Sequence, residues 1–389
     1  MLSIGKLVSA RYYLDSVAKR IEDYYAGIGE APGVWLGRAA IGLGLDGEVA
    51  DGDLEPLLGG LSPDGTALVS GKAAAPGRLP GFDLTFSSPK SVTLLFALGD
   101  PALSAAARAA HDRAVRQALG YLEESAIRVR RGKDGATVLP GEGMMAAGFR
   151  HRTSRAGDPQ LHTHVLVMNM AKGPDGRFSA LDGTAFYAHA RTAGFLYQAA
   201  LRAELTATVG VEWGAVQRGV AEVAGFTKAE LGEFSRRRAE IDARMTTLGT
   251  TSPRAAQAAT LDTRQAKKPA RRIDLAPLDQ VNAKDYQVEP RALLADWRRR
   301  ADLIGLSDAV IAARTGPGRA PLPLNLADAQ AWLLSPEGLT AHASTFDQRD
   351  VLRGLAERAP EGATVAELET AAEVVLGAPG VVRLDAGTG

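Results

Sequence analysis

The sequence predicts an α+β protein, in which strands and long helices share one part of the chain. Residues 82–86 read Phe-Asp-Leu-Thr-Phe, and this alternation of apolar and polar side chains is typical of a strand with one buried face. Residues 103–124 form an alanine-rich amphipathic stretch and 186–209 a second long segment, both expected to be helices. The triplet His-Thr-His at 162–164 runs into the apolar residues 165–168, which predicts a further strand.

Composition limits the class of protein. The chain has 389 residues, enough for a large core and two or more domains. It has no cysteine, which excludes disulfides and cysteine-ligated metal sites. No apolar run approaches the roughly 18 residues of a membrane span and the N-terminus lacks signal-peptide features, so we expect a cytoplasmic protein. Lys plus Arg equals Asp plus Glu at 45 each, so a nucleic-acid site requires local clustering of basic residues.

Three of the six histidines lie between Gly148 and Ala171. Residues two apart in a strand share a face, so His162 and His164 are expected to point to the same side of a sheet. His151 precedes them across a polar connection, and a neighbouring antiparallel strand there would bring its imidazole to the same point. Three neutral imidazoles suit a divalent metal with open coordination positions. A His-x-His pair alone is more often two half-buried polar residues of a strand.

The N-terminal segment carries two adjacent tyrosine pairs. Residues 1–4 are expected to form a short edge strand that Gly5 ends, and 7–26 a helix with an apolar stripe. A tyrosine on such a helix usually packs with its hydroxyl at the rim. Adjacent residues project in different directions, so only one of each pair can sit centrally on the stripe. The other lies nearer solvent or a cleft, where a nucleophile is expected. The pairs are Tyr12 with Tyr13 and Tyr24 with Tyr25.

The strand at 82–86 leads into a helix with a polar start. Residues 27–80 before it are rich in glycine and proline and are expected to be loops with short helices. Asp83 and Thr85 share the polar face of the strand, where a carboxylate can orient a metal-ligating histidine; an exposed strand carboxylate is the alternative. Ser-Ser-Pro-Lys-Ser then predicts a helix whose N–H groups and Lys90 can hold a phosphate, although an ordinary capped helix has the same pattern.

Residues 127–148 are expected to form a hairpin with its turn at 133–135. One strand of it is strongly basic, which suits either a solvated face or part of a DNA track; these residues are Arg128, Arg130 and Arg131. His111 lies in line with the apolar side of its helix and is interpreted as packed or at the rim. His189 is interpreted as a surface residue.

The second half of the chain is more charged. Residues 214–245 are expected to be helical, and 264–300 contain ten basic against five acidic residues. The basic stretch indicates segments that close over an anionic ligand, or solvated helices. Residues 316–323 are a candidate linker, followed from about Leu339 by a helix-turn-helix-like unit. Its signals are the capping-box patterns Thr345-x-x-Gln348 and Thr364-x-x-Glu367 and a possible strand at 381–384.

Three motifs in this order resemble the conjugative relaxases of the TrwC/TraI (MobF) kind, within the HUH endonuclease superfamily. They are the leading tyrosine pairs, the segment FDLTFSSPKSVT and the pattern His-x10-His-x-His. The resemblance implies a relaxase domain over residues 1–300, a connection over 301–338 and the start of a truncated helicase-like region over 339–389. Tyr24 lies twelve positions after Tyr12, wider than in the best-known members, and Thr163 replaces the hydrophobic residue of the superfamily name.

The resemblance implies site- and strand-specific nicking of single-stranded plasmid DNA at a transfer origin, with a 5′-phosphotyrosyl intermediate that is later religated. It implies that the three histidines hold Mg²⁺ or Mn²⁺, with Zn²⁺ or Ni²⁺ also accepted in vitro. Asp83 would orient one histidine, Tyr12 would attack first and Tyr13 second, and Tyr24 or Tyr25 would serve a second transesterification. Cationic residues expected at phosphate or DNA are Lys90, Arg150, Arg152 and Arg155.

The resemblance also implies a central antiparallel, HUH or palm-like sheet with helices packed behind it. A basic helical lid from residues 230–300 would cover a single-stranded DNA cleft. Expected partners are plasmid DNA with a hairpin at the origin, relaxosome accessory proteins and a type IV secretion coupling protein, without membrane insertion. The alternatives are a rolling-circle replication initiator or HUH transposase, a three-histidine hydrolase or oxygenase, and a DNA-binding module with an inert metal.

Overall fold

The computed structural model describes residues 1–7, 32–50, 52–70, 77–154, 156–247 and 290–384. Its centre is a five-stranded antiparallel sheet with the strand order β1-β3-β7-β6-β2. The strands are β1 (Leu2–Leu7), β2 (Val34–Leu36), β3 (Gly81–Ser87), β6 (Ala146–Thr153) and β7 (Pro159–Met168). The predicted α+β class with a central antiparallel sheet is therefore confirmed.

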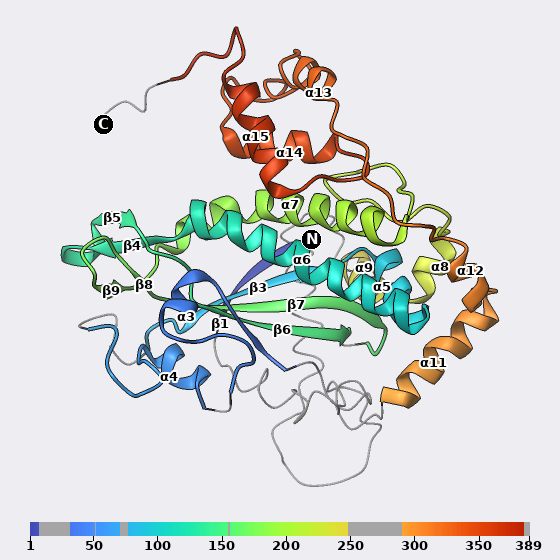
Figure 1. Ribbon diagram of the computed structural model, residues 1–389, viewed down its shortest axis with the longest axis horizontal. Coiled ribbons are helices and arrows are strands. Elements are labelled where there is room, and N and C mark those ends of the chain that lie inside the picture. The colour runs from blue at the N-terminus through green and yellow to red at the C-terminus, as the bar shows by residue number, and fades with distance from the viewer. Residues whose placement is uncertain (8–31, 51, 71–76, 155, 248–289, 385–389) are drawn as a thin grey trace.

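One face of the sheet is covered by three helices, α5 (Lys90–Leu98), α6 (Pro101–Ala126) and α7 (Gly183–Val209) (Figure 1). The two long helices were predicted, but each begins a few residues before the expected start. The reason is an aspartate cap at each helix. The Asp100 carboxylate accepts a hydrogen bond from the backbone N–H of Leu103, and the Asp182 carboxylate accepts one from the backbone N–H of Thr184. The apolar residues of β3 alternate toward these helices, as the pattern at 82–86 requires.

Within the described residues, the opposite face is covered at one end. There α3 (Arg38–Gly42), α4 (Leu54–Gly59) and the loops around them form a second apolar core. This core packs on Phe149, Leu166 and Met168, which point away from α6 and α7. The other end of the same face carries the histidines. The short helices expected within residues 27–80 are thus confirmed for the described part of that segment.

Strand β1 is an edge strand, as predicted, but Gly5 does not end it. The pairing with β3 continues through Gly5, opposite Asp83, to Leu7, opposite Gly81. A single glycine weakens a strand but keeps its N–H and C=O groups, so the ladder can pass through it. Leu7 is buried in the second core and fixes the end of the strand.

The predicted basic hairpin is confirmed in a shorter form. It consists of β4 (Arg128–Arg131) and β5 (Thr137–Pro140), joined through a 3-10 turn at Lys133–Gly135. Residues after 145 belong instead to β6 of the main sheet. A second small ribbon, β8 (Ala171–Lys172) with β9 (Phe178–Ser179), lies beside the hairpin.

The helical expectation for residues 214–245 is wrong for its first part. Residues 214–227 are irregular, with two isolated bridges, and helices begin only at α8 (Lys228–Glu233) and α9 (Arg236–Thr247). The cause is a tight turn at Arg218 and Gly219, which both have positive φ, a conformation that a helix cannot contain. After residue 289 the chain continues with α11 (Pro290–Leu303) and α12 (Asp308–Ala312).

The C-terminal part forms α13 (Leu326–Leu333), α14 (Gln348–Glu357) and α15 (Val365–Leu376), which pack above α7 (Figure 1). The Thr364–Glu367 capping box is confirmed at α15. At α14 the box is formed by Asp347 and Asp350, because the helix begins two residues later than the threonine pattern predicted. Residues 381–384 are irregular, so the strand expected there is wrong.

The C-terminal helices join the main core through a buried cation. Arg202 of α7 is 1% exposed and donates hydrogen bonds to the carbonyl oxygens of Gly219, Ala356 and Ala359. Residues 316–323, a candidate linker, run along the end of α7, where Arg319 N–H donates to the Thr206 carbonyl. Of the helices in the described ranges, none combines the length and apolar character that crossing a bilayer requires.

Candidate metal centre

The three histidines of the Gly148–Ala171 segment converge on one point. His162 and His164 leave the same face of β7, and His151 lies directly opposite His162 on β6. One ring nitrogen of each imidazole lies within 4.8 Å of those of the other two. The ring centroids are 5.0 to 5.2 Å apart, and the ring planes are inclined to one another. This arrangement suits three ligands of one divalent ion, as the strand pattern predicted.

Two of the imidazoles have their tautomer fixed by neighbouring acceptors. His162 donates from Nδ1 to the carbonyl oxygen of Gln160 at 2.8 Å. His164 donates from Nδ1 to the Asp83 carboxylate, 2.8 Å from Oδ1 and 3.0 Å from Oδ2. A proton on Nδ1 puts the ring lone pair on Nε2, the nitrogen that a metal would take. The hydroxyl of Thr85 lies 3.1 Å from the same Nδ1 of His164, so the polar face of β3 is used as predicted.

The three ligands differ in exposure. His151 is buried at 1% exposure, while His162 and His164 are partly accessible. An ion held here would have protein behind it and an open side in front, which is the asymmetry of a metal site that accepts a further ligand. A register shift in β6 just after His151 lets the chain leave the ladder and begin the connection to β7.

A buried carboxylate in the β6–β7 connection was not singled out by the sequence analysis. Asp158 is 1% exposed, and its Oδ1 accepts hydrogen bonds from Arg236 Nε at 2.8 Å and Arg300 Nη1 at 3.0 Å. The indole N–H of Trp297 donates to the Gly157 carbonyl oxygen at 2.9 Å. Helices α9 and α11 are thereby fixed to the turn that joins the ligand strands. The available signal was an acidic residue in a connection with glycine and proline, which is too common to be specific.

Lys90 lies beside the ligand strand. Its ammonium donates to the Pro159 carbonyl at 2.7 Å and to Gln160 Oε1 at 3.0 Å, and burial lowers the pKa of the amine to about 8. The phosphate site expected at the N-terminus of its helix is wrong in one respect. The first N–H group of α5 after Lys90, that of Ser91, donates to the Glu222 carboxylate at 2.8 Å. A carboxylate of the chain itself therefore holds this helix end.

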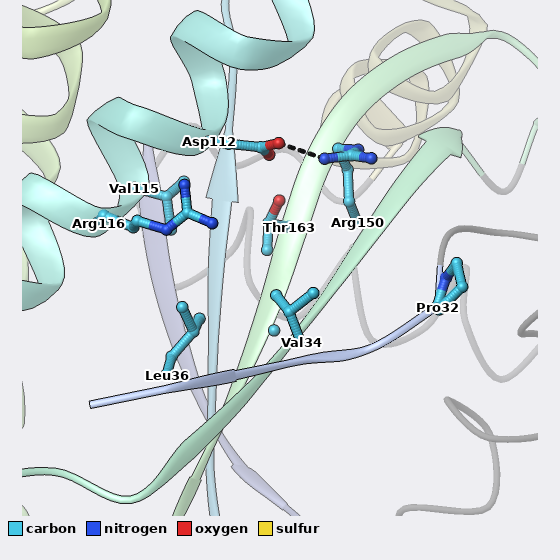
Figure 2. Close-up of a pocket in the computed structure, with 9 residues that line it drawn as sticks. Pro32, Val34, Leu36, Asp112, Val115, Arg116, Arg150 and Thr163 are labelled. Atoms are coloured by element: carbon cyan, nitrogen blue, oxygen red, sulfur yellow. Dashed lines mark hydrogen bonds and ion pairs between the residues drawn. The ribbon is translucent and has the colours of Figure 1, made fainter. Parts of the chain in front are cut away.

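Arg150 points away from the histidines. It alternates with His151 along β6 and forms an ion pair with Asp112 of α6 on the helical side of the sheet. Figure 2 shows this pair among the residues that line a cavity of about 90 Å³, with Thr163 drawn below it. Arg152 is half-buried in β6. The four tyrosines and Arg155 lie outside the described residues, so the structure brings together the three histidines and Asp83 from the predicted set, with Lys90 at the start of the same ligand strand.

Comparison with known proteins identifies the family. A family model described as TrwC relaxase matches residues 8–286. The Multifunctional conjugation protein TraI of Escherichia coli (strain K12) is 40% identical over 177 residues, which are 44% of this chain and 10% of that protein. The chain therefore spans about a tenth of the length of the curated relatives it matches.

Solved structures of the conjugative relaxase TrwC in complex with oriT DNA are similar over the whole of their chains. A copper-bound complex has a TM-score of 0.65 and 28% sequence identity, and covers 79% of this chain. A metal-bound complex has a TM-score of 0.64 and 29% identity over the same share. A complex with a 27-mer DNA that comprises the recognition hairpin and the cleavage site has a TM-score of 0.61. With its three-histidine face and the family match over most of its length, the chain belongs to the TrwC relaxase family of conjugative, DNA-nicking transesterases.

Proposed function

We propose that this protein nicks and rejoins one strand of plasmid DNA at a transfer origin. The observation that carries the proposal is the convergence of His151, His162 and His164 on a partly open face, with two tautomers fixed. Neutral imidazoles of this geometry suit a divalent cation. We propose Mg²⁺ or Mn²⁺ as the ion that acts on DNA, with Zn²⁺ or Ni²⁺ as substitutes, because imidazole also binds those ions well.

When bound, a divalent cation supplies positive charge at the scissile phosphate and aligns its non-bridging oxygens. The three histidines would hold the ion. The Asp83 carboxylate binds the Nδ1 proton of His164, so that Nε2 of this ring faces the ion. The partly accessible edges of His162 and His164 form the open side through which a phosphate can approach. Lys90, beside the ligand strand, adds a cation near this edge, and Arg155 is a second candidate for that task.

The nucleophile in this proposal is a tyrosine of the N-terminal segment. Tyr12 attacks phosphorus first and Tyr13 second, while Tyr24 or Tyr25 serves a later transesterification. The attacking oxygen forms the phosphotyrosyl ester, the bond to the 3′ oxygen breaks, and that oxygen leaves as a hydroxyl after taking up a proton. Because one ester replaces another, the step is reversible and needs no ATP. What supports the involvement of this segment is that Leu7 before it and Val34 after it both pair with strands of the histidine sheet.

DNA outside the scissile phosphate needs a longer basic track. The hairpin β4–β5, the turn before β9 and residues 67–70 line an open groove of about 1020 Å³ with four basic side chains, Arg130, Arg131, Lys133 and Arg177. Asp175 and Asp182 pair with the three arginines, and DNA phosphates would have to share them. We assign this groove to the folded part of the origin, since phosphate contacts dominate the affinity of such sites. Arg150 and Arg152 stay candidates for the single-stranded part, as does the basic lid expected over residues 230–300.

The wider role proposed here follows the family. The protein acts in the bacterial cytoplasm with relaxosome accessory proteins and hands the covalent DNA complex to a type IV secretion coupling protein. Residues 1–300 form the relaxase region, 301–338 the connection and 339–389 the start of a helicase-like region. The many contacts of the C-terminal helices with α7 favour a close association of the first and last of these parts.

The test is covalent adduct formation. Labelled single-stranded oligonucleotides with candidate origin sequences are incubated with the protein and Mn²⁺ and separated on a denaturing gel. We expect a slow protein–DNA band that requires metal and is lost in Tyr12→Phe, in the variant with all four tyrosines replaced, and in His162→Ala. His189→Ala, a half-buried histidine away from the site, is the control and keeps the band. Cleavage without an adduct in the four-tyrosine variant would identify a hydrolase and refute the proposal.

A further inference from the structure

A chain of three hydrogen-bonded side chains runs behind the metal centre, through the helical face of the sheet. The imidazole of His111 on α6 contacts the hydroxyl of Tyr197 on α7 through Nδ1 and the hydroxyl of Thr163 on β7 through Nε2, both at 2.8 Å. All three residues are buried. Thr163 is the residue between the ligands His162 and His164, and its side chain points to the opposite face.

The three hydrogen-bonded side chains are uncharged. Burial lowers the pKa of His111 to about 3, with the Arg150 charge as a smaller cause, and burial raises the pKa of Tyr197 well above its ordinary value. A neutral imidazole donates from one nitrogen and accepts at the other, so it fits between two hydroxyl groups that can each do either. Tyr197 also packs edge-on against His111 and against Phe86 of β3, which restricts its ring.

These hydrogen-bonded side chains fix the distance between β7 and the helices, which the pairing of strands in the sheet does not fix. Hydrogen bonds to β3 and β6 fix β7 within the plane of the sheet, but its distance from the helices depends on side chains. The neighbouring inward residues Leu161 and Val165 are apolar, and apolar contacts have no strong direction. A hydrogen bond has a preferred direction, and a misplaced donor or acceptor leaves a buried polar group unsatisfied. Side chains of Ser88 and Thr93 bond to the backbone of Leu161 and so anchor the start of β7 to α5 and the segment before it. The bond between Thr163 and His111 anchors the strand to α6, and it lies between the two ligands.

We propose that His111 and Tyr197 are positioning residues for the metal centre. They hold Thr163 at a fixed distance from α6 and α7, and so set where His162 and His164 meet His151. The inference rests on the metal site proposed above. It also accounts for a hydroxyl at position 163, where an apolar side chain would pack with less desolvation.

The protein offers a matched control on the same two helices. Tyr121 of α6 is buried, and its hydroxyl lies 2.7 Å from Nδ1 of His189 on α7. Tyr197→Phe and Tyr121→Phe therefore delete the same atom from the same kind of hydrogen bond between α6 and α7. Only Tyr197→Phe interrupts the series of hydrogen bonds that ends at Thr163 on the ligand strand. At position 163, Val removes the hydroxyl at nearly constant shape, while Ser keeps it.

The experiment measures Mn²⁺ affinity by calorimetry, the visible spectrum of the Co²⁺-loaded protein and the melting temperature of the metal-free protein. We expect Thr163→Val to weaken Mn²⁺ binding about tenfold, the lower end of what loss of a supporting hydrogen bond costs a metal site, and to shift the Co²⁺ bands. Tyr197→Phe is expected to act in the same direction. Thr163→Ser restores wild-type affinity. Tyr121→Phe lowers the melting temperature without changing affinity or spectrum.

The outcomes separate this inference from the proposed function. If wild-type protein binds Mn²⁺ and forms the DNA adduct, while Thr163→Val and Tyr197→Phe bind the ion as tightly as wild type, the chain serves stability alone and the inference is overturned. The proposed function then stands. If Tyr121→Phe weakens metal binding as much as Tyr197→Phe does, the effect is general loosening of α6 against α7, and the inference is equally overturned. If wild-type protein binds none of the ions, both the site and the inference fall.

Discussion

Asp83 on β3 and His164 on β7 are diagonal neighbours on one face of the sheet, with Nδ1 of the imidazole 2.8 Å from Oδ1 and 3.0 Å from Oδ2 of the carboxylate. The carboxylate therefore accepts one proton with both of its oxygens. This contact fixes the rotation of the ring and leaves the opposite nitrogen free of a proton. The ligand on β7 is thus oriented from the neighbouring strand, by a residue whose face is set by the alternation of residues 82–86.

We expect Asp83→Asn to weaken metal binding about tenfold, since the amide retains an acceptor for Nδ1 but loses the charge that strengthens the bond. Asp83→Ala should have a larger effect because it removes the acceptor. Calorimetric titration with Mn²⁺ and Zn²⁺ provides the measurement. Asp175→Asn, which alters a carboxylate paired with Arg131 and Arg177 in the β8–β9 turn, serves as control. Equal affinities for Asp83→Asn and wild type would contradict the role given to the carboxylate.

The buried Asp158 carboxylate is expected to be important for stability. Asp158→Asn removes the buried carboxylate shared by Arg236 and Arg300 and leaves Arg300 with the more exposed Glu233 and Asp296, which should cost about 3 kcal/mol of unfolding free energy. Asp242→Asn makes the same chemical change in the exposed pair with Arg238 and should cost below about 1 kcal/mol. Urea denaturation of both variants beside wild type tests the difference. A similar small loss in both would mean that Arg300 finds sufficient compensation elsewhere.

The neutral state of His111 predicts loss of stability in acid. Its pKa is about 3 in the folded protein against 6.5 for a free histidine, so between these values the unfolded chain binds a proton that the folded chain does not. Stability from this group is complete above pH 6.5 and declines as the pH falls toward 3, by about 1.4 kcal/mol per pH unit. Unfolding free energies of wild type and His111→Gln at pH 7, 6 and 5 should converge as the pH falls. If the unfolding free energies of the two proteins stayed equally far apart at all three pH values, His111 would not be neutral in the folded protein.

Close packing at Gly362 predicts a large penalty for a methyl group. Gly362 has φ 87°, and a Cβ there would collide with the carbonyl oxygen of Ala199 on α7. Gly380 has φ 95° with open space around it, so Gly380→Ala pays for the backbone conformation only, about 1–2 kcal/mol. Gly362→Ala should cost about 1–3 kcal/mol more. Denaturant unfolding of the two variants isolates the contact between the C-terminal helices and α7, and equal losses would argue against it.

Much of the site could be predicted because strand periodicity is simple. The two-residue repeat places His162 with His164, and Asp83 with Thr85, without knowledge of the tertiary structure. The same rule separates Arg150 from His151, and this separation is why Arg150 faces α6. The partners of these residues could not be predicted, since contacts such as Asp158 with Arg300 or Thr163 with His111 join residues far apart in sequence.

Local signals also explain the errors. A glycine in an apolar–polar pattern is usually interpreted as the end of a strand. Strand β1 nevertheless continues through Gly5, because pairing with β3 requires only the backbone of this residue. Residues 214–227 precede a charged helical segment and are expected to belong to it, but the turn at Arg218 and Gly219 interrupts any helix there. Glu222 then caps α5, a role that no local pattern shows. The tyrosine segment and Arg155 lie outside the described residues, and their roles stay predictions.

The burial of Arg202 has a practical consequence for the choice of expression fragments. Its guanidinium is satisfied partly by the carbonyl oxygens of Ala356 and Ala359. A recombinant fragment that stops at residue 338 removes both acceptors and uncovers the apolar side of α7 at the same time. Such a fragment would be prone to aggregate even if every residue at the metal site were intact. Fragments intended for crystallisation or DNA-binding assays should therefore extend through α15.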